Sequence, residues 1–279
     1  MPHEVLKALD VKAGEIVVDA TYGQGGHSAL LKKEAKIKLV ALDADPAAGV
    51  VNANFGDLGK VAEDLGISQI NKALFDLGWN RGQLSMGRGF SFMTDEPLNM
   101  SYGPTARSGF TATEILNTFT EKALADIFFG YGEERYARRI ASAVVERRLV
   151  KPFETTMELV EVIKDAVPAA YRRGRLHPAT RTFQGLRIAV NDELGVIEQG
   201  IKAAWSLLAC EGRIAVITFH SIEDRVVKRL FASFTKAESK QKGRLLYKKP
   251  LIPTAAEVKA NPASRSAKLR VIEKICTDI

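Results

Sequence analysis

The sequence has few cysteines and no long apolar run, and each shortage excludes a class of protein. Its 279 residues include only two cysteines, Cys210 and Cys276, whose separation matches no metal-binding spacing. No window reaches the about 18 apolar residues of a membrane span, and no basic segment with an apolar run opens the chain as in a secretion signal. We therefore expect a cytoplasmic protein without a bound metal, in which both cysteines are buried free thiols.

Positive charge is concentrated in two segments. The net charge of the chain is +7. Residues 131–190 contain 12 Lys and Arg and 7 Asp and Glu, and residues 221–279 contain 14 Lys and Arg and 6 Asp and Glu. Two basic segments on an otherwise acidic chain favour a polyanion partner, most simply nucleic acid, although a solubilising surface gives the same counts. One predicted helix holds five arginines that either contact phosphate or pair with neighbouring glutamates: Arg135, Arg138, Arg139, Arg147 and Arg148.

A glycine-rich turn follows the first predicted strand. Ile16–Val18 is a β-branched run typical of a strand covered on both faces, and a helix is expected from Ser28. Between them, Gly23, Gly25 and Gly26 allow a sharp turn and a close approach of the backbone to a ligand. Strand, turn and helix form the first half of a nucleotide-binding unit, with the ligand beyond the carboxyl end of the strand. A glycine turn without a ligand is the alternative.

Acidic residues end the next two clear strands. Asp43 follows the run 39–42, and Asp76 ends the run 73–77, so both should lie on the same rim of a parallel sheet as the glycine turn. An acid at the end of the second strand accepts hydrogen bonds from ribose hydroxyls in related folds. Only 30 residues separate Asp43 from Leu74, so the helix after Asp43 is expected to be about one turn long or absent.

The middle of the chain changes in pattern. Residues 79–104 are rich in glycine, lack periodic apolar positions and are expected to form a long functional loop. Residues 112–166 have apolar positions at helical spacing with no intervening strand, which predicts an inserted helical domain. The α/β pattern returns at about residue 182.

Eight motifs, spread over nearly the whole chain, resemble those of the bacterial small-subunit rRNA N4-cytidine methyltransferases. Each is weak alone, but together and in this order they are highly specific. They are Asp19-Ala-Thr-Tyr-Gly-Gln-Gly-Gly-His-Ser28, Asp76-Leu-Gly78, Arg88-Gly-Phe-Ser-Phe92, Tyr131-Gly-Glu-Glu-Arg135, His177-Pro-Ala-Thr-Arg-Thr-Phe-Gln184, Leu186-Arg-Ile-Ala-Val-Asn-Asp-Glu-Leu194, Phe219-His-Ser-Ile-Glu-Asp-Arg225 and Ser264-Arg-Ser-Ala-Lys-Leu-Arg270.

The resemblance implies a fold, a cofactor and a substrate. The fold is a Rossmann-like class I methyltransferase sheet formed by residues 1–104 and 182–279, with residues 105–181 as an inserted helical domain for substrate recognition. The methyl donor is S-adenosylmethionine (SAM), and the acceptor is a cytidine in the decoding region of 16S rRNA in the small ribosomal subunit. The donor contacts fall on Gly25, Gly26, His27, Asp43, Phe55, Asp76 and Gln83.

The reaction needs alignment more than acid–base strength, because methyl transfer is an in-line displacement. The cytosine amine is a weak nucleophile that must be held by hydrogen bonds. We expect Asp76, with Asn99, to orient this amine and His220 or a water molecule to accept its proton. Two simpler roles stay open: Asp76 only holds the donor, and His220 only ties the strand end.

The chain departs from the family at two places that should wall the substrate pocket. The usual Asp-Leu-Gly-Val-Ser-Ser is replaced at Trp79-Asn-Arg81, and Leu-Asp-Met-Arg reads Leu98-Asn-Met-Ser101. An rRNA-binding relative without methyl transfer is therefore one alternative function. A nicotinamide-dependent oxidoreductase is a weaker one, because Ser28 stands where a dinucleotide motif needs its last glycine. The sequence does not set the oligomeric state, for which a dimer is one option.

Overall fold

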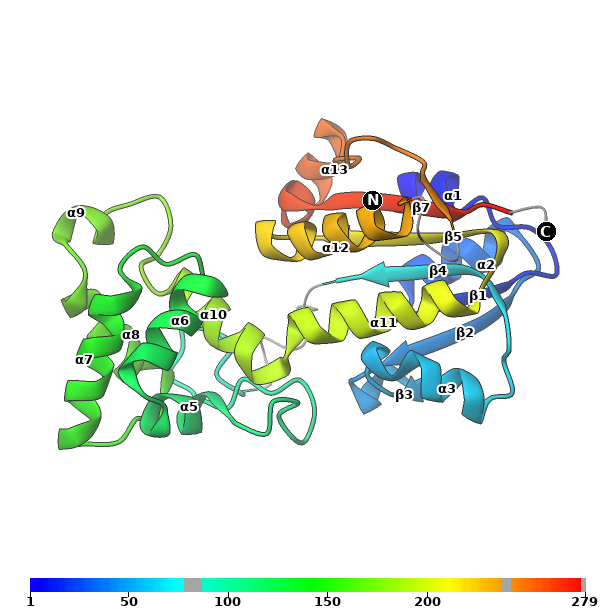
Figure 1. Cartoon of the computed structure of the whole chain (residues 1–279). Coiled ribbons are helices and arrows are strands. Elements are labelled where there is room, and N and C mark those ends of the chain that lie inside the picture. The colour runs from blue at the N-terminus through cyan, green and yellow to red at the C-terminus, as the bar shows by residue number, and fades with distance from the viewer. Residues whose placement is uncertain (78–86, 237–241, 277–279) are drawn as a thin grey trace. The chain divides into compact units, whose positions relative to one another are not determined.

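The computed structural model describes residues 1–77, 87–236 and 242–276, and the chain divides into two compact units (Figure 1). One unit comprises Met1–Gly78 and Leu194–Ile279, and it contains the sheet. The other comprises Trp79–Glu193, and its described elements are helices.

The first unit is built on a sheet that has seven strands within the described residues, in the order β3-β2-β1-β4-β5-β7-β6. Neighbouring strands from β3 to β5 are parallel, whereas β7 is antiparallel to both β5 and β6. The chain order reverses between β1 and β4, and the carboxyl ends of strands at such a switch point form a ligand-binding crevice. The strands are β1 (Ile16–Asp19), β2 (Lys38–Asp43), β3 (Val51–Asn52), β4 (Ile70–Asp76), β5 (Leu208–Thr218), β6 (Gly243–Leu245) and β7 (Lys268–Lys274).

Helices cover both faces of this sheet, as the uninterrupted apolar strands require. Val18 and Phe75 face one core with α3 (Leu58–Asp64), α11 (Glu193–Leu207) and α12 (Ser221–Phe234), whose apolar sides pack on them. Val17 and Leu74, their neighbours in sequence, face the opposite core with α1 (Pro2–Leu9) and α2 (Gly26–Glu34). A short helix, α13 (Ala255–Ala260), precedes β7. This two-sided cover and mixed strand order confirm the predicted Rossmann-like α/β fold.

The connection between β2 and β3 is short, as the spacing predicts. It consists of a single 3-10 turn, Pro46–Ala48, which Asp45 caps by accepting a hydrogen bond from the backbone of Ala47 at 2.9 Å. The following strand β3 has two residues. Only this short turn therefore separates Asp43, at the end of β2, from the start of β3.

The second unit packs six helices of the described region around one apolar core. They are α5 (Ala112–Thr118), α6 (Glu121–Gly130), α7 (Ala137–Val150), α8 (Thr156–Ala166), α9 (Ala169–Arg172) and α10 (Thr180–Asn191). Phe90, Leu98 and Met100 from the glycine-rich segment are also buried in this core, and so are Phe183 and Leu186 of α10. The helical unit therefore extends on both sides beyond the predicted range 105–181, because apolar side chains outside that range complete its core.

The two cysteines correct a prediction. Cys210 and Cys276 are exposed and joined by a disulfide, with their Cα atoms 5.3 Å apart. Arg213 of β5 lies opposite Glu273 of β7, so the same antiparallel register places the two cysteines across from each other. The prediction of buried free thiols was wrong because sequence spacing does not show strand register.

No helix in the described ranges is both long enough and apolar enough to cross a membrane.

Candidate functional site

The glycine turn after β1 has a backbone that requires glycine. Gly23 and Gly25 adopt positive φ angles of 54° and 73°, a region that side chains disfavour. A Cβ on Gly25 would also lie 2.6 Å from the ring of Tyr22. Gly25 precedes the first turn of α2, whose backbone N–H groups have no partners within the helix and form a site for a negatively charged or polar ligand.

A buried carboxylate that was not among the predicted site residues holds this turn in place. Asp19 at the end of β1 accepts hydrogen bonds from the hydroxyl of Ser28 at 2.6 Å and from the backbone N–H of Thr21 at 3.2 Å. Burial raises the pKa of Asp19. The sequence signal for this hydrogen bond is an acid at the end of a buried strand followed by a serine at the start of the next helix.

Asp43 joins the end of β2 to the glycine turn. One carboxylate oxygen accepts a hydrogen bond from the backbone N–H of Gly23 at 2.6 Å, and the other accepts one from the N–H of Asp45 at 2.8 Å. Each oxygen keeps a lone pair that can accept a further hydrogen bond. Asp43 is therefore a fixed acceptor at the end of β2, and its expected contact with the ribose hydroxyls stays a prediction.

Asp76 at the end of β4 carries an unused acceptor. Its backbone N–H donates to the hydroxyl of Thr21 at 2.7 Å, and its Oδ2 lies 3.5 Å from Nε2 of His27. Its Oδ1 is buried and has no hydrogen-bond partner among the described residues. Because an unpaired buried polar atom costs about 1–3 kcal/mol, such an atom indicates a polar ligand at this point.

Phe55 lies beyond the short strand β3, in the 3-10 turn Phe55–Asp57. Its ring meets Phe75 edge to face with centroids 5.7 Å apart, and a Cβ on Gly200 would come within 2.8 Å of it. The half-buried ring is thus fixed against the core at the edge of the sheet. Its expected contact with the adenine of the donor stays a prediction.

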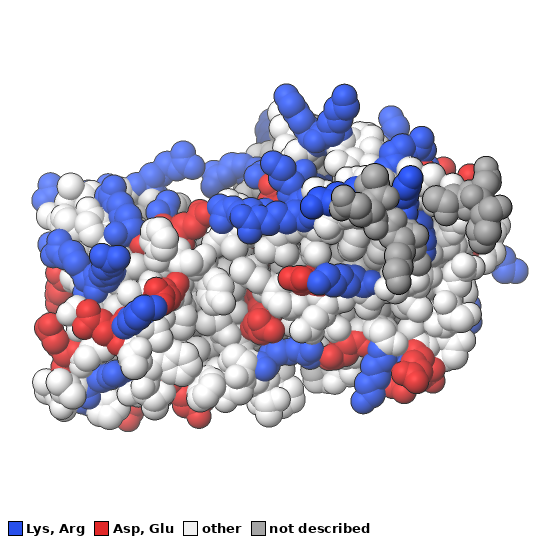
Figure 2. All heavy atoms as spheres, viewed as in Figure 1, with Lys and Arg blue, Asp and Glu red and all other residues white. Residues whose placement is uncertain are grey.

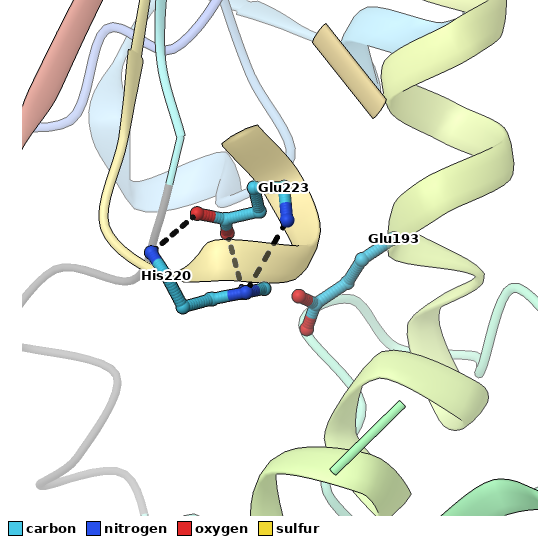
Figure 3. A group of neighbouring side chains, drawn as sticks. All are labelled: Glu193, His220 and Glu223. Atoms are coloured by element: carbon cyan, nitrogen blue, oxygen red, sulfur yellow. Dashed lines mark hydrogen bonds and ion pairs between the residues drawn. The ribbon is translucent and has the colours of Figure 1, made fainter. Parts of the chain in front are cut away.

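His220 caps α12 (Figure 3). Its Nδ1 accepts a hydrogen bond from the backbone N–H of Glu223 at 3.4 Å, while the Glu223 carboxylate accepts bonds from the N–H groups of His220 and Phe219. Nε2 of His220 lies 2.9 Å from Oε1 of Glu223 but outside hydrogen-bond geometry. Since Nδ1 already accepts a bond, this arrangement favours the simpler role, in which His220 ties the strand end to the helix.

The structure brings part of the predicted site together. Within the first unit, Asp76 contacts His27, and Asp43 contacts Gly23 in the turn that also holds Gly25. Asn99 belongs to the helical unit, where its side-chain oxygen accepts a hydrogen bond from the N–H of Ser101 at 2.9 Å. Gln83 and the substituted residues 79–81 lie outside the described residues.

A sheet of this order, with a glycine turn after its first strand and acids ending its second and fourth, fits the Rossmann-like fold of methyltransferases. The sequence profile described as the MraW methylase family matches residues 1–275. The chain therefore belongs to the MraW methylase family, which confirms the resemblance drawn from its motifs. It is an enzyme that uses SAM as the methyl donor.

Three curated relatives cover almost the whole chain. All three are named ribosomal RNA small subunit methyltransferase H. The protein from Sulfurihydrogenibium sp. (strain YO3AOP1) is 44% identical over 288 residues, which cover 98% of this chain and 97% of the relative. The protein from Heliobacterium modesticaldum is 42% identical over 304 residues (98% and 96%), and the one from Geobacter sp. (strain M21) is 42% identical over 305 residues (99% and 97%).

Proposed function

We propose that this chain methylates N4 of a cytidine in the decoding region of 16S rRNA, with SAM as the donor. The observation that carries the proposal is Oδ1 of Asp76, a buried carboxylate oxygen that has no partner among the described residues at the sheet's switch point. The names of the relatives support the ribosomal RNA of the small subunit as the substrate. The cytidine and its N4 atom follow from the motifs that the chain shares with that family.

The residues of the crevice fit the donor. A Cβ on Gly26 would meet nothing within 4 Å, so the turn formed by Gly25, Gly26 and His27 is open to the donor at that point. Asp43 offers acceptors to the ribose hydroxyls. Phe55 borders the same end of the sheet and would face the adenine. When bound, SAM supplies an electrophilic methyl group on a sulfonium. Gln83 is proposed as a further contact from the resemblance alone.

Asp76 is proposed to hold the acceptor. Its Oδ1 can accept a hydrogen bond from the exocyclic amine. This bond fixes the nitrogen in place and makes its lone pair more available for attack on the methyl group. Asp76 is itself positioned by Thr21 through its backbone and by His27 through Oδ2. Asn99 is proposed as a second hydrogen-bond partner of the amine from the sequence alone, since its side chain carries both an acceptor and a donor.

The proton released by the amine goes to water. His220 is the acceptor within the chain that the sequence suggests, but its Nδ1 is occupied as the helix cap. A water molecule that reaches the crevice has no such constraint. Methyl transfer then forms a nitrogen–carbon bond, breaks a sulfur–carbon bond and leaves the proton in solvent.

The helical unit is proposed to select the RNA. Residues 105–181, the predicted insert, lie within it, and so does the basic segment 131–190. An rRNA base must be unpaired before its amine can enter a crevice, and a basic surface that binds single strands favours that state. We place this reaction in the cytoplasm, where ribosomal subunits are assembled.

The proposal is tested by mapping methylated cytidines in 16S rRNA from cells with and without this gene. The expected result is one N4-methylcytidine in the decoding region that disappears with the gene and returns with a plasmid copy. Unchanged cytidine methylation overturns the proposal. SAM binding by the purified protein together with unchanged methylation would instead support the rRNA-binding relative that lacks methyl transfer.

A further inference from the structure

Two motifs of the helical unit meet backbone to backbone. A Cβ on Gly132 would lie 2.6 Å from the carbonyl oxygen of Phe128 and would overlap that of Arg181. Directly after the other motif, a Cβ on Gly185 would lie 3.0 Å from the carbonyl oxygen of Ile127. Arg181 also donates a hydrogen bond to the carbonyl oxygen of Glu133 at 2.8 Å. Because residues 132 and 185 are both glycines, the backbone near residue 132 can lie directly against the backbone near residue 181.

A buried acid at the same place holds two tyrosines against which an arginine packs. Glu134 is fully buried and accepts hydrogen bonds from the hydroxyl of Tyr171 at 2.6 Å and the N–H of Tyr136 at 2.8 Å. Burial and Glu134 raise the pKa of Tyr171 to about 12, so its hydroxyl stays a donor. The guanidinium of Arg135 lies 4.6 Å from the Tyr171 ring centre and 4.8 Å from that of Tyr136, in cation–π contact with both.

Beside this arginine the surface is hollowed. The hollow has a volume of about 330 Å³ and is lined by Arg135, Tyr171, Arg175, Leu176, His177 and Arg181, together with Gly174. The ring of His177 stacks on Phe92 with centroids 4.8 Å apart, and burial lowers its pKa, so it is neutral at pH 7. We call this feature the arginine hollow. Figure 2 shows Lys and Arg side chains gathered over the part of the unit that holds α9, the helix that contains Tyr171.

Among the arginines of the same unit, Arg147 lies 3.5 Å from the Glu158 carboxylate. Arg148 donates to the carbonyl oxygens of Leu116 and Phe119, as Arg181 of the hollow does to that of Glu133. Within the described ranges, no carboxylate forms an ion pair with Arg135, Arg175 or Arg181. Three guanidinium groups thus line one concave surface without an anionic partner in the described part of the chain, and a planar guanidinium suits phosphate oxygens.

We propose that the arginine hollow binds a backbone phosphate of the rRNA substrate, which fixes the strand on the helical unit. The inference rests on the proposed function for the identity of the RNA. Arg135 is held in place before binding by its two tyrosines, so little side-chain freedom is lost when a phosphate binds. The half-exposed Leu176 at the edge of the hollow offers contact to a sugar or base, which a free phosphate ion lacks.

The test measures binding of a short RNA hairpin with unpaired cytidines to the full chain and to the variants Arg135→Ala and Arg175→Ala. Arg175 is exposed and has no structural role in the contacts above, so its variant should fold as the wild type does. Each variant is expected to weaken RNA binding about tenfold, which corresponds to about 1.4 kcal/mol. The slope of the logarithm of the RNA association constant against the logarithm of the salt concentration should become shallower by about 0.7 for each phosphate that the variant no longer neutralises.

Matched controls separate this role from general charge. Lys122→Ala removes one positive charge from an exposed ion pair with Asp126 in the same unit and should change RNA binding by less than about twofold. Arg135→Lys keeps the charge but loses the planar stack, so it should recover only part of the affinity. Wild-type RNA binding by both alanine variants overturns the proposal, as does inorganic phosphate that competes as well as RNA at equal ionic strength.

The outcomes distinguish this inference from the proposed function. If the wild type methylates 16S rRNA and the two variants bind the hairpin normally, only the arginine hollow is wrong. If the wild type transfers no methyl group to 16S rRNA, the proposed function fails whatever the variants do.

Discussion

The carboxylate of Asp43 accepts a hydrogen bond of 2.6 Å from the backbone N–H of Gly23. The end of the second strand and the glycine turn after the first are therefore held as one piece. Because Asp43 also accepts a bond from Asp45, its orientation is set before any ligand binds. This preorganisation makes Asp43 the residue on which donor affinity should depend most.

Asp43→Ala should raise the dissociation constant for SAM about 10- to 100-fold. The change removes an acceptor for the ribose and also frees the glycine turn, and bonds to a charged group contribute about 1.5–3 kcal/mol each. Asp45→Ala is the matched control, because the Asp45 side chain caps the neighbouring 3-10 turn while its backbone N–H, which donates to Asp43, is kept. Calorimetric titration with SAM measures both variants. Equal affinities for the two would contradict this role of Asp43.

Asp19→Asn should change the pH dependence of stability. The pKa of Asp19 is raised by burial, so between its ordinary pKa near 4 and its native pKa the folded state binds more protons than the unfolded state. The free energy of unfolding of the wild type therefore falls as pH rises through that window. An asparagine keeps both contacts, because its oxygen accepts from Thr21 and its NH₂ group donates to the Ser28 hydroxyl. It does not titrate, so the variant should not lose stability in this pH window.

Urea unfolding of both proteins from about pH 4 to pH 8 measures the effect. The stability of Asp19→Asn relative to the wild type is expected to increase with pH and then to level off above the native pKa. A difference that is constant over the whole range would show that Asp19 has the same pKa folded and unfolded.

Gly132→Ala should destabilise the helical unit by about 1–3 kcal/mol or more, because its new methyl group would overlap the backbone of Arg181. Gly130→Ala, two residues earlier, meets nothing within 4 Å and lies at the end of α6. It should be neutral or stabilising by up to about 1 kcal/mol. Urea unfolding measures both variants, and equal stabilities would show that the backbones do not approach closely at Gly132.

Reduction of the disulfide should lower the stability of the chain. The bond between Cys210 and Cys276 closes a loop with a sequence separation of 66, for which the chain-entropy estimate is about 4 kcal/mol. Adding dithiothreitol should lower the midpoint of urea unfolding of the wild type. The variant Cys276→Ser should already have the lower midpoint and should not respond to the reductant. A wild-type midpoint that is insensitive to dithiothreitol would show that the thiols are free in solution.

Features set by local sequence were predictable. The β-branched run 16–18 and the glycines that follow it determine strand and turn by themselves, and the spacing after Asp43 left room for only one helical turn. The acids at 43 and 76 could be placed on one rim because the carboxyl ends of parallel strands meet there. These inferences need the identity of nearby residues and no knowledge of distant contacts.

Features set by distant contacts were not predictable. Phe90 and Leu98 lie in a glycine-rich segment without periodicity, yet they are buried by helices far along the chain. Asp192, in a left-handed conformation, separates α10 from α11, and the local sequence does not mark this break. The sequence suggests two roles for His220, a proton acceptor and a link at the strand end, and the cap that it forms on α12 depends on how Glu223 folds back.

The role of Asp76 is tested most directly by methyl transfer to small ribosomal subunits from cells that lack this gene. Wild-type protein and Asp76→Ala are compared with labelled SAM, and SAM binding of each is measured separately. We predict one N4-methylcytidine in 16S rRNA with the wild type and a rate at least about 100-fold lower with Asp76→Ala. Wild-type methylation by Asp76→Ala would contradict the assignment of Asp76 to the site.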